Sequence, residues 1–138
     1  MTKQTHKKCN KCGETKPLSA FHKRPDRPIG VRSKCKACDL KEKRESFSGR
    51  LSAYKCGARK RNIEWDLSKA EFNSFWKKPC YYCGSKIDTI GIDRIDSSKG
   101  YTIDNVVSCC ETCNKMKMAL AQDVFVEHCL KVANNLCA

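Results

Sequence analysis

Four Cys-x-x-Cys pairs constrain what this chain of 138 residues can fold into more than any other feature. The pairs are Cys9/Cys12, Cys35/Cys38, Cys80/Cys83 and Cys110/Cys113. Two such pairs supply the four thiolates that one tetrahedral zinc binds, and a zinc with four cysteine ligands keeps no open position for a reaction. We therefore predict two structural zinc ions, one on the first two pairs and one on the last two.

The remaining cysteines and the histidines are predicted to stay outside these sites. We expect buried or surface thiols at the four cysteines that lack such a partner, which are Cys56, Cys109, Cys129 and Cys137. Cys109 is interpreted as a strand residue beside the ligand Cys110. His22 could replace a cysteine of the first site, but with four cysteines present we predict a surface residue. We assign no catalytic role to His128.

The 12 cysteines are close to the share of cysteine that marks a secreted protein held together by disulfides, but the rest of the sequence indicates a reducing compartment. The N-terminal MTKQTHKK has no apolar stretch after it, and no run approaches the roughly 18 apolar residues of a membrane span. We therefore expect a cytoplasmic protein without a membrane partner. Thiols stay reduced there, and paired cysteines more often bind metal.

The charge is concentrated in one half of the chain. Residues 1–62 carry 19 Lys and Arg against 5 Asp and Glu, whereas residues 63–138 carry 9 against 10, so the net charges are +14 and −1. Two zinc ions on eight thiolates would lower the total of +13 to about +9. A chain this basic favours nucleic acid as a partner. We predict phosphate binding by the run Arg59, Lys60 and Arg61, with a solvated helix face as the alternative.

The chain divides into three predicted parts. Residues 1–40 form a four-cysteine zinc ribbon, because so small a piece needs a metal staple to fold. Residues 41–62 form a basic helical linker with a break, in which Ser46 or Ser48 can cap a helix. Residues 63–138 form the third part.

Two helices are predicted within the third part. Ser68 and Glu71 form a capping box that opens a helix running through Trp76, and we assign its aromatic side chains to the core. A final helix from Gln122 to Leu136 has one apolar face that we expect to pack against the zinc-stapled module. That face comprises Phe125, Cys129, Val132, Ala133 and Leu136.

The stretch from Cys80 to Lys117 has a recognisable order of elements. A predicted strand over 90–96 carries an aspartate, a second strand over 105–108 opens on an asparagine, and Cys-x-x-Cys-Asn follows on a helix. This order resembles the zinc-stapled branch of the HNH (ββα-metal, His-Me finger) endonucleases, including the phage recombination endonuclease VII type. Residues 1–40 resemble the ribbon that often precedes such a module in phage proteins. The resemblance implies an α+β fold: a small zinc-stapled ββα module with flanking helices, preceded by the ribbon.

The resemblance also implies a second kind of metal site. Asp93 and the amide oxygen of Asn114 match the two protein ligands of a catalytic Mg²⁺ or Mn²⁺, and magnesium prefers such oxygen ligands. Asn105 matches the asparagine that orients the catalytic loop by hydrogen bonds. Lys115 and Lys117 can reach phosphate from the helix, with plain solvation of Lys117 as the alternative.

Arg94 departs from the family pattern. It occupies the position of the family's histidine base, and an arginine stays protonated at ordinary pH, so it cannot accept a proton from water. Asp96, Tyr101 and metal-bound hydroxide are the candidates to replace that base. Arg94 would then clamp phosphate or stabilise the transition state. Alternatively, Arg94 pairs with Asp96 in a nuclease-like fold that has lost activity.

Two functions follow from these patterns. The leading hypothesis is a phage-encoded, metal-dependent DNA endonuclease that hydrolyses phosphodiester bonds, by nicking or by double-strand cleavage. The alternative is a non-catalytic zinc protein that binds DNA or RNA on the same scaffold.

Overall fold

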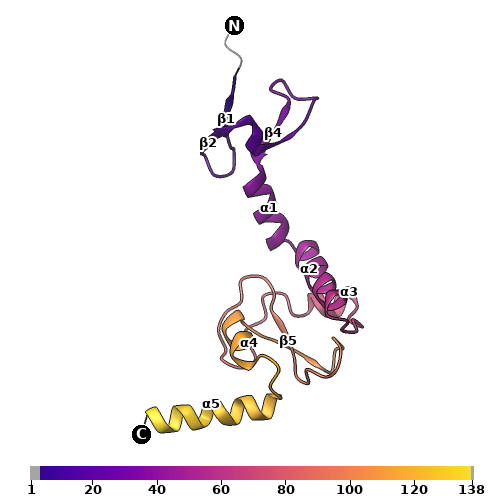
Figure 1. The fold of residues 1–138 in the computed structure, drawn as a ribbon, viewed down its shortest axis with the longest axis vertical. Coiled ribbons are helices and arrows are strands. Elements are labelled where there is room, and N and C mark those ends of the chain that lie inside the picture. Colours follow the sequence, from indigo (N-terminus) through magenta and orange to yellow (C-terminus); the bar gives the residue numbers. More distant parts are fainter. Residues whose placement is uncertain (1–3, 138) are drawn as a thin grey trace. The chain divides into compact units, whose positions relative to one another are not determined.

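A computed structural model describes residues 4–137 of the chain, which form two compact units (Figure 1). The first unit ends at Gly49 and the second begins at Arg50. Helix α2 (Phe47–Lys60) begins in the first unit and lies mainly in the second. The structure describes no helix that is long and apolar enough to cross a membrane.

The first unit consists of two small antiparallel sheets and one helix. Strand β1 (His6–Lys8) pairs with β2 (Thr15–Pro17), and after the 3-10 turn η1 (Leu18–Ala20) strand β3 (Phe21–Lys23) pairs with β4 (Val31–Cys35). Helix α1 (Lys36–Glu45) follows directly. The hydrophobic core of the first unit is small and consists of Cys9, Phe21, Val31 and Cys35. Two cysteines in so small a core agree with the expectation that this unit needs a metal.

The predicted break in the helical segment is confirmed. Helix α1 ends at Glu45 and α2 begins at Phe47, with Ser46 in an extended conformation between them. The Ser46 hydroxyl accepts a hydrogen bond from the Gly49 amide at 3.1 Å, so it caps one of the free amides at the start of α2.

The capping box in the second unit is confirmed, but the helix that it opens is shorter than predicted. The Ser68 hydroxyl accepts from the Glu71 amide at 3.2 Å, and Glu71 accepts from the Ser68 amide at 2.8 Å. Helix α3 (Lys69–Asn73) then ends before Trp76. The following amides bond three residues back instead of four, which tightens the chain into turns.

Aromatic side chains from distant parts of the sequence form the core beside α3. Phe72 is fully buried and its ring centre lies 5.6 Å from that of Tyr54 and 5.7 Å from that of Trp65. Trp65 in turn lies 5.1 Å from Tyr101. The prediction that the helix aromatics are core residues is confirmed for Phe72 and Phe75, and Trp76 is half-buried.

The ββα order predicted for the stretch after Cys80 is present. Strand β5 (Ile92–Arg94) pairs antiparallel with β6 (Val106–Ser108), Asp93 lies opposite Val107, and helix α4 (Glu111–Lys117) follows. Both strands are shorter than predicted. Gly91 precedes β5 where a side chain would collide with the carbonyl of Cys109, so the close approach of the two strands requires a glycine.

Helix α5 (Gln122–Leu136) has the predicted bounds, and its predicted packing is correct for Phe125 and wrong for Val132, Ala133 and Leu136, which are exposed. Among its residues only Phe125 is buried, where its ring contacts Tyr82 with the ring centres 5.3 Å apart. The N-terminal part of the helix is therefore the part that contacts the module.

Candidate functional site

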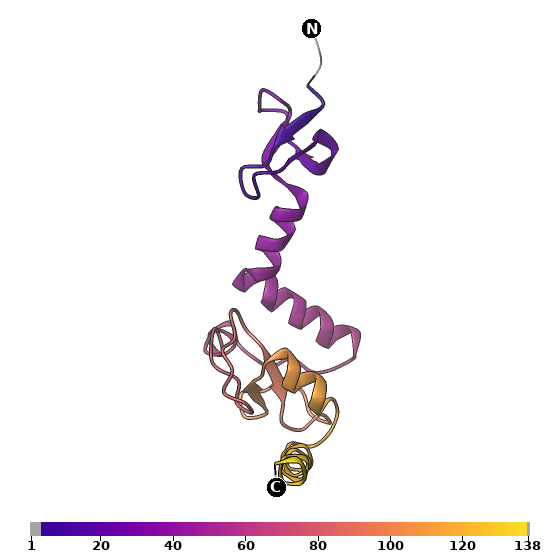
Figure 2. The same ribbon diagram turned by 90° about the vertical axis from the view of Figure 1, so that its left-hand side faces the viewer.

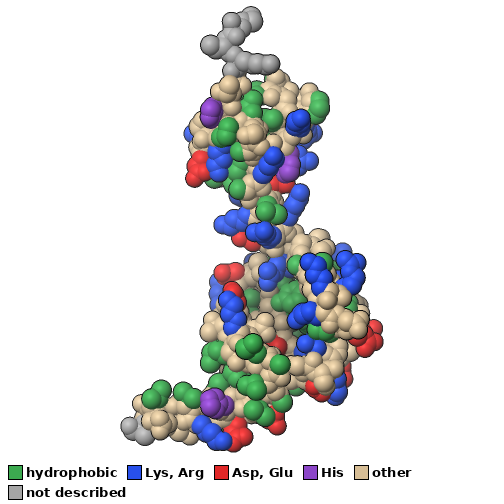
Figure 3. All heavy atoms as spheres, in the orientation of Figure 1, with side chains coloured by type: hydrophobic (Ala, Val, Ile, Leu, Met, Phe, Trp, Pro, Cys, Tyr) green, Lys and Arg blue, Asp and Glu red, His purple; other side chains and the backbone are tan. Residues whose placement is uncertain are grey.

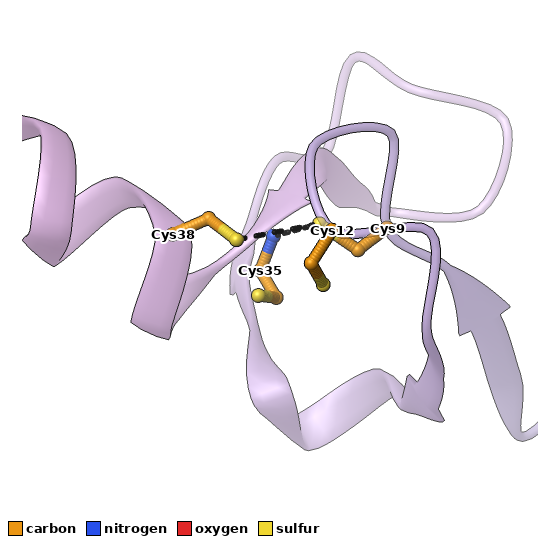
Figure 4. Close-up of side chains that lie close together, drawn as sticks. All are labelled: Cys9, Cys12, Cys35 and Cys38. Atoms are coloured by element: carbon orange, nitrogen blue, oxygen red, sulfur yellow. Dashed lines mark hydrogen bonds between the residues drawn. The ribbon is translucent and has the colours of Figure 1, made fainter.

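The first four-cysteine cluster has the geometry of a zinc site (Figure 4). The sulfur atoms of Cys9, Cys12, Cys35 and Cys38 all lie within 4.8 Å of one another, and those of Cys9 and Cys38 are 4.0 Å apart. Four sulfurs around one tetrahedral zinc, each about 2.3 Å from the metal, are about 3.8 Å apart. Cys35 ends β4 and Cys38 lies in the first turn of α1, so a zinc here would join the sheet to the helix.

The second cluster joins the loop before the ββα unit to the start of α4. The sulfur atoms of Cys80, Cys83, Cys110 and Cys113 also lie within 4.8 Å of one another, and those of Cys83 and Cys110 are 3.7 Å apart. Cys110 caps α4 and accepts a hydrogen bond from the Cys113 amide. The predicted sets of four are therefore brought together, and both fit zinc.

Each cluster contains the same tight turn. Gly13 and Gly84 follow the second cysteine of their pairs and have φ of 74° and 70°, and each amide bonds to the carbonyl of the first cysteine at 2.9 Å. Only glycine adopts this conformation without strain, so Cys-x-x-Cys-Gly is the complete signature of this turn.

The residues predicted to be non-ligands lie as expected. The thiol of buried Cys109 donates to the Cys110 carbonyl at 3.4 Å and belongs to neither cluster. His22 is exposed and lies 3.6 Å from a carboxylate oxygen of Asp39.

Asp93 is buried beside two donors. Its Oδ2 atom lies 3.1 Å from the ammonium of Lys117 and accepts a hydrogen bond from the Tyr82 hydroxyl at 3.2 Å. No described residue donates to its Oδ1 atom. Burial and, next, the charge of Asp93 raise the pKa of Tyr82, so the hydroxyl stays protonated and remains a donor. The carboxylate is therefore held by one oxygen and leaves the other for a ligand.

The structure corrects the prediction for Lys117. Its side chain is completely buried, and besides the contact with Asp93 its ammonium donates to the Arg94 carbonyl at 2.9 Å. It therefore cannot meet a phosphate at the surface. The sequence held a signal for this position, because Lys117 follows the ligand Cys113 by four residues and lies on the same helix face. Nothing in the sequence pointed to Tyr82.

Asn105 organises the loop between β5 and β6. Its Nδ2 donates to the carbonyls of Asp96 and Gly100 at 3.1 and 2.9 Å, and its Oδ1 accepts from the Asp96 amide at 3.0 Å. The side chain is buried and its polar atoms are all engaged across the loop. This arrangement agrees with the loop-orienting role that the resemblance implies.

Asp96 is engaged within the same loop. Its Oδ1 accepts from the amide and hydroxyl of Ser98 at 2.9 and 2.6 Å, and its Oδ2 lies 3.6 Å from the ammonium of Lys99. The hydrogen bonds from Ser98 lower the pKa of Asp96. A carboxylate with a lowered pKa and occupied oxygens is a weak proton acceptor.

No ion pair joins Arg94 to Asp96 among the described residues, so the pairing in that alternative is wrong, whereas the loss of activity stays a hypothesis. One guanidinium nitrogen, Nη1, donates to the carbonyls of Ser97 and Lys99 at 2.7 and 2.6 Å. The guanidinium carbon lies 5.4 Å from the ring centre of Tyr101, within range of a cation–π contact. Arg94 also lines a polar hollow of about 570 Å³ with the loop residues 97–100.

Asn114 lies on the exposed side of α4 and lines another hollow, of about 620 Å³. Asp88 and Glu111 supply carboxylates to its lining, and Arg50 supplies a guanidinium. Asp93 is not among the residues that line this hollow. The two predicted magnesium ligands lie on different elements, Asp93 on β5 and Asn114 on α4.

The predicted phosphate-binding residues other than Lys117 are exposed. Arg59 and Lys60 lie in the last turn of α2, whereas Arg61 is tied to the Gly57 carbonyl and the Tyr101 hydroxyl. Lys115 is exposed and pairs with Glu111 at 2.6 Å. Figure 3 shows further Lys and Arg side chains on the face of the first unit that is in view.

Comparisons with known proteins give two similarities. No protein-family model matches the chain. An uncharacterized protein of Acanthamoeba polyphaga mimivirus is 40% identical over 89 residues, which is 63% of this chain. The chain spans only 17% of that protein's length. Among solved structures, the chain is similar to the rare-cutting HNH restriction endonuclease PacI, with 22% identity, a TM-score of 0.47, and coverage of 93% of this chain and 96% of PacI.

Proposed function

We propose that this protein is a metal-dependent DNA endonuclease of the HNH type. The observation that carries the proposal is the ββα unit itself. A buried carboxylate on β5, a loop held by Asn105 and a helix that carries Asn114 are fixed to one another next to a four-cysteine cluster. A catalytic metal needs ligands on such a rigid support.

The free Oδ1 of Asp93 and the side-chain oxygen of Asn114 are the proposed protein ligands of one Mg²⁺ or Mn²⁺. Both donors are oxygens, as these ions prefer. Such an ion, when bound, would polarise the phosphoryl group and stabilise the leaving oxygen. Asp93 needs its negative charge for this role, and the ammonium of Lys117 lies 3.1 Å from its Oδ2 atom as a counter-charge.

The two side chains that the sequence indicates as candidate bases both take part in hydrogen bonds. Tyr101 is buried and accepts a hydrogen bond from Arg61, and Asp96 is engaged with Ser98. We infer that the attacking water loses its proton to solvent. Arg94 is placed at the edge of the polar hollow, where its guanidinium could meet a phosphate.

Cleavage of supercoiled plasmid tests this proposal, with Asp93→Asn and Asp96→Asn as a matched pair. With Mg²⁺ or Mn²⁺, we expect the wild type to nick or linearise the plasmid. Asp93→Asn should lower the rate by about a thousandfold or more while DNA binding persists, because it removes the ligand charge. Asp96→Asn should lower it less than about tenfold, because the amide oxygen can still accept from Ser98.

Two results would decide otherwise. If Asp96→Asn abolished cleavage and Asp93→Asn did not, the roles of the two carboxylates would be reversed. Salt-sensitive DNA binding without any cleavage would favour a non-catalytic zinc protein. An origin in a phage and a cytoplasmic location remain predictions from the sequence.

A further inference from the structure

Tyr82 connects the second cysteine cluster to the proposed ligand of the catalytic metal. It lies between Cys80 and Cys83 in the sequence, and its hydroxyl donates to the Oδ2 atom of Asp93 at 3.2 Å. Its half-buried ring meets the ring of Phe125 edge-on, with the two ring planes at 90°. One side chain therefore contacts both the metal-binding carboxylate and α5, from within a turn that carries two cysteines of the cluster.

The backbone around Tyr82 is tied to the strand pair. The Tyr81 amide donates to the Ser108 carbonyl at 2.8 Å, and the Ser108 hydroxyl donates to the Pro79 carbonyl at 2.5 Å. Ser108 is the last residue of β6, and β6 pairs with the strand that carries Asp93. The distance from the Tyr82 ring to the carboxylate is therefore set by a short chain of hydrogen bonds that does not involve α4.

The other partner of Oδ2 restricts the carboxylate less. Lys117 reaches Asp93 from α4, which lies beside the strand pair in both ribbon views (Figures 1 and 2). An ammonium is a compact charge with three rotatable donors, so it attracts a carboxylate without fixing the plane in which the carboxylate lies. The torsion that turns this plane is broad. A second donor from a different element is therefore needed to hold one orientation.

We propose that Tyr82 is a positioning residue for Asp93, which holds the carboxylate with its Oδ1 atom available to a divalent cation. The inference rests on the proposed role of Asp93 as a metal ligand. Among the described residues no group donates to Oδ1, so the contacts at Oδ2 decide where Oδ1 points. A ligand that is oriented before the metal binds loses less freedom on binding. Tyr82 should therefore increase the affinity for the metal.

Binding of Mn²⁺ to the zinc-loaded protein without DNA tests this role, and electron paramagnetic resonance measures the free Mn²⁺. Tyr82→Phe keeps the ring that packs against Phe125 and removes only the hydroxyl. It should raise the Mn²⁺ dissociation constant about tenfold or more. Tyr81→Phe is the matched control, because it makes the same change at the neighbouring residue, which is 59% exposed and bonds to Gln122. Asp93→Asn identifies the part of the binding that belongs to this site.

Plasmid cleavage at increasing Mn²⁺ concentration separates positioning from a purely structural role. In Tyr82→Phe, the Mn²⁺ concentration that gives half the maximal rate should rise by the same factor as the dissociation constant. The rate at saturating Mn²⁺ should stay within about threefold of the wild type, because the bound metal then holds the carboxylate itself. A purely structural role would lower the rate at every Mn²⁺ concentration. Circular dichroism and zinc content show whether each variant is folded.

The outcomes distinguish this inference from the proposed function. If folded Tyr82→Phe binds Mn²⁺ as tightly as the wild type, or if Tyr81→Phe weakens binding equally, the positioning role is overturned and the nuclease is not. If the wild type binds Mn²⁺ through Asp93 but cleaves no DNA, the nuclease is overturned and the Mn²⁺ affinities still decide the role of Tyr82. Mn²⁺ binding that Asp93→Asn leaves unchanged would overturn both.

Discussion

At the scale of single residues, the contact between Asp93 and Lys117 places two opposite charges inside the second unit. The Lys117 side chain is completely buried and that of Asp93 is 8% exposed, with 3.1 Å between ammonium and carboxylate. Taking such charges out of water is costly, and their attraction repays the cost only while both are present. The pair therefore couples the fold to the charge of the proposed metal ligand.

Lys117→Met should lower the free energy of unfolding by about 3 kcal/mol, because it leaves Asp93 buried without its counter-charge. The double variant with Asp93→Asn should lose clearly less than the sum of the two single losses. Lys115→Met is the control: that lysine is exposed, and its loss should change stability by less than about 0.5 kcal/mol. Urea unfolding of the zinc-loaded protein measures all four. Additive losses would show that the two charges do not interact.

The spacing of residues in the sequence predicted which cysteines lie together, but it did not predict that Lys117 is buried beside Asp93. The eight cysteines of the two clusters follow from local patterns, since Cys-x-x-Cys brings two sulfurs close together at the spacing of zinc ligands. The sequence predicts Lys117 at the surface, because lysine is rarely buried without a partner and its partner Asp93 is 24 residues away in sequence. Only the pairing of β5 with β6 and the packing of α4 bring the two together.

At the scale of elements, the cysteine clusters replace a larger core. The hydroxyl of Ser85, followed by its amide, lowers the pKa of Cys83 from 9.0 to about 6, and the amide of Cys12, followed by that of Cys35, lowers the pKa of Cys9 to about 6. In the same clusters, hydrogen bonding with the Cys35 thiol raises the pKa of Cys38 to about 12, and burial raises the pKa of Cys113. Each cluster therefore contains a thiol that ionises readily beside one that does not, and zinc would bind all four as thiolates. Because folding lowers the pKa values of Cys83 and Cys9, the stabilisation that these two thiols contribute is full above the ordinary thiol pKa and is lost as the pH falls through about 6.

Acidification should therefore release zinc below about pH 6, with loss of the folded state in the same pH range. A colorimetric zinc indicator and circular dichroism, followed from pH 8 to pH 4, measure the two events. At neutral pH the wild type should hold two zinc ions per chain. Cys109→Ser should also hold two, whereas Cys80→Ser should hold one and lose the structure of the second unit. Zinc loss in Cys109→Ser would assign that thiol to the site.

Prediction of α5 from the sequence was correct in its bounds, and it was correct in its packing only near the N-terminus of the helix. Helical periodicity gives an apolar face and its limits, but it does not say how much of that face a neighbouring element covers. Phe125 meets Tyr82, whereas Val132, Ala133 and Leu136 are exposed. The covered length of the face depends on where the chain between α4 and α5 directs the helix, and periodicity does not contain that direction.

At the scale of the whole molecule, the positive charge predicts how DNA binding should depend on salt. The net charge of +13 falls to about +9 with two zinc ions bound, and it is concentrated in residues 1–62. Each phosphate that a Lys or Arg neutralises releases counterions, so affinity falls steeply as salt rises and carries little sequence preference. The exposed Arg59 and Lys60 at the end of α2 are proposed as two of these contacts.

Replacing both Arg59 and Lys60 by alanine should weaken binding to all duplex sequences alike and reduce the slope of log affinity against log salt concentration by about two. Lys131→Ala is the control, because Lys131 is 70% exposed on α5 and pairs with Glu127, away from the basic half of the chain. Fluorescence anisotropy with a labelled duplex at several salt concentrations gives both slopes. An unchanged slope in the double variant would mean that the α2 end is a solvated surface, and the phosphate contacts would then have to come from the cations of the zinc ribbon.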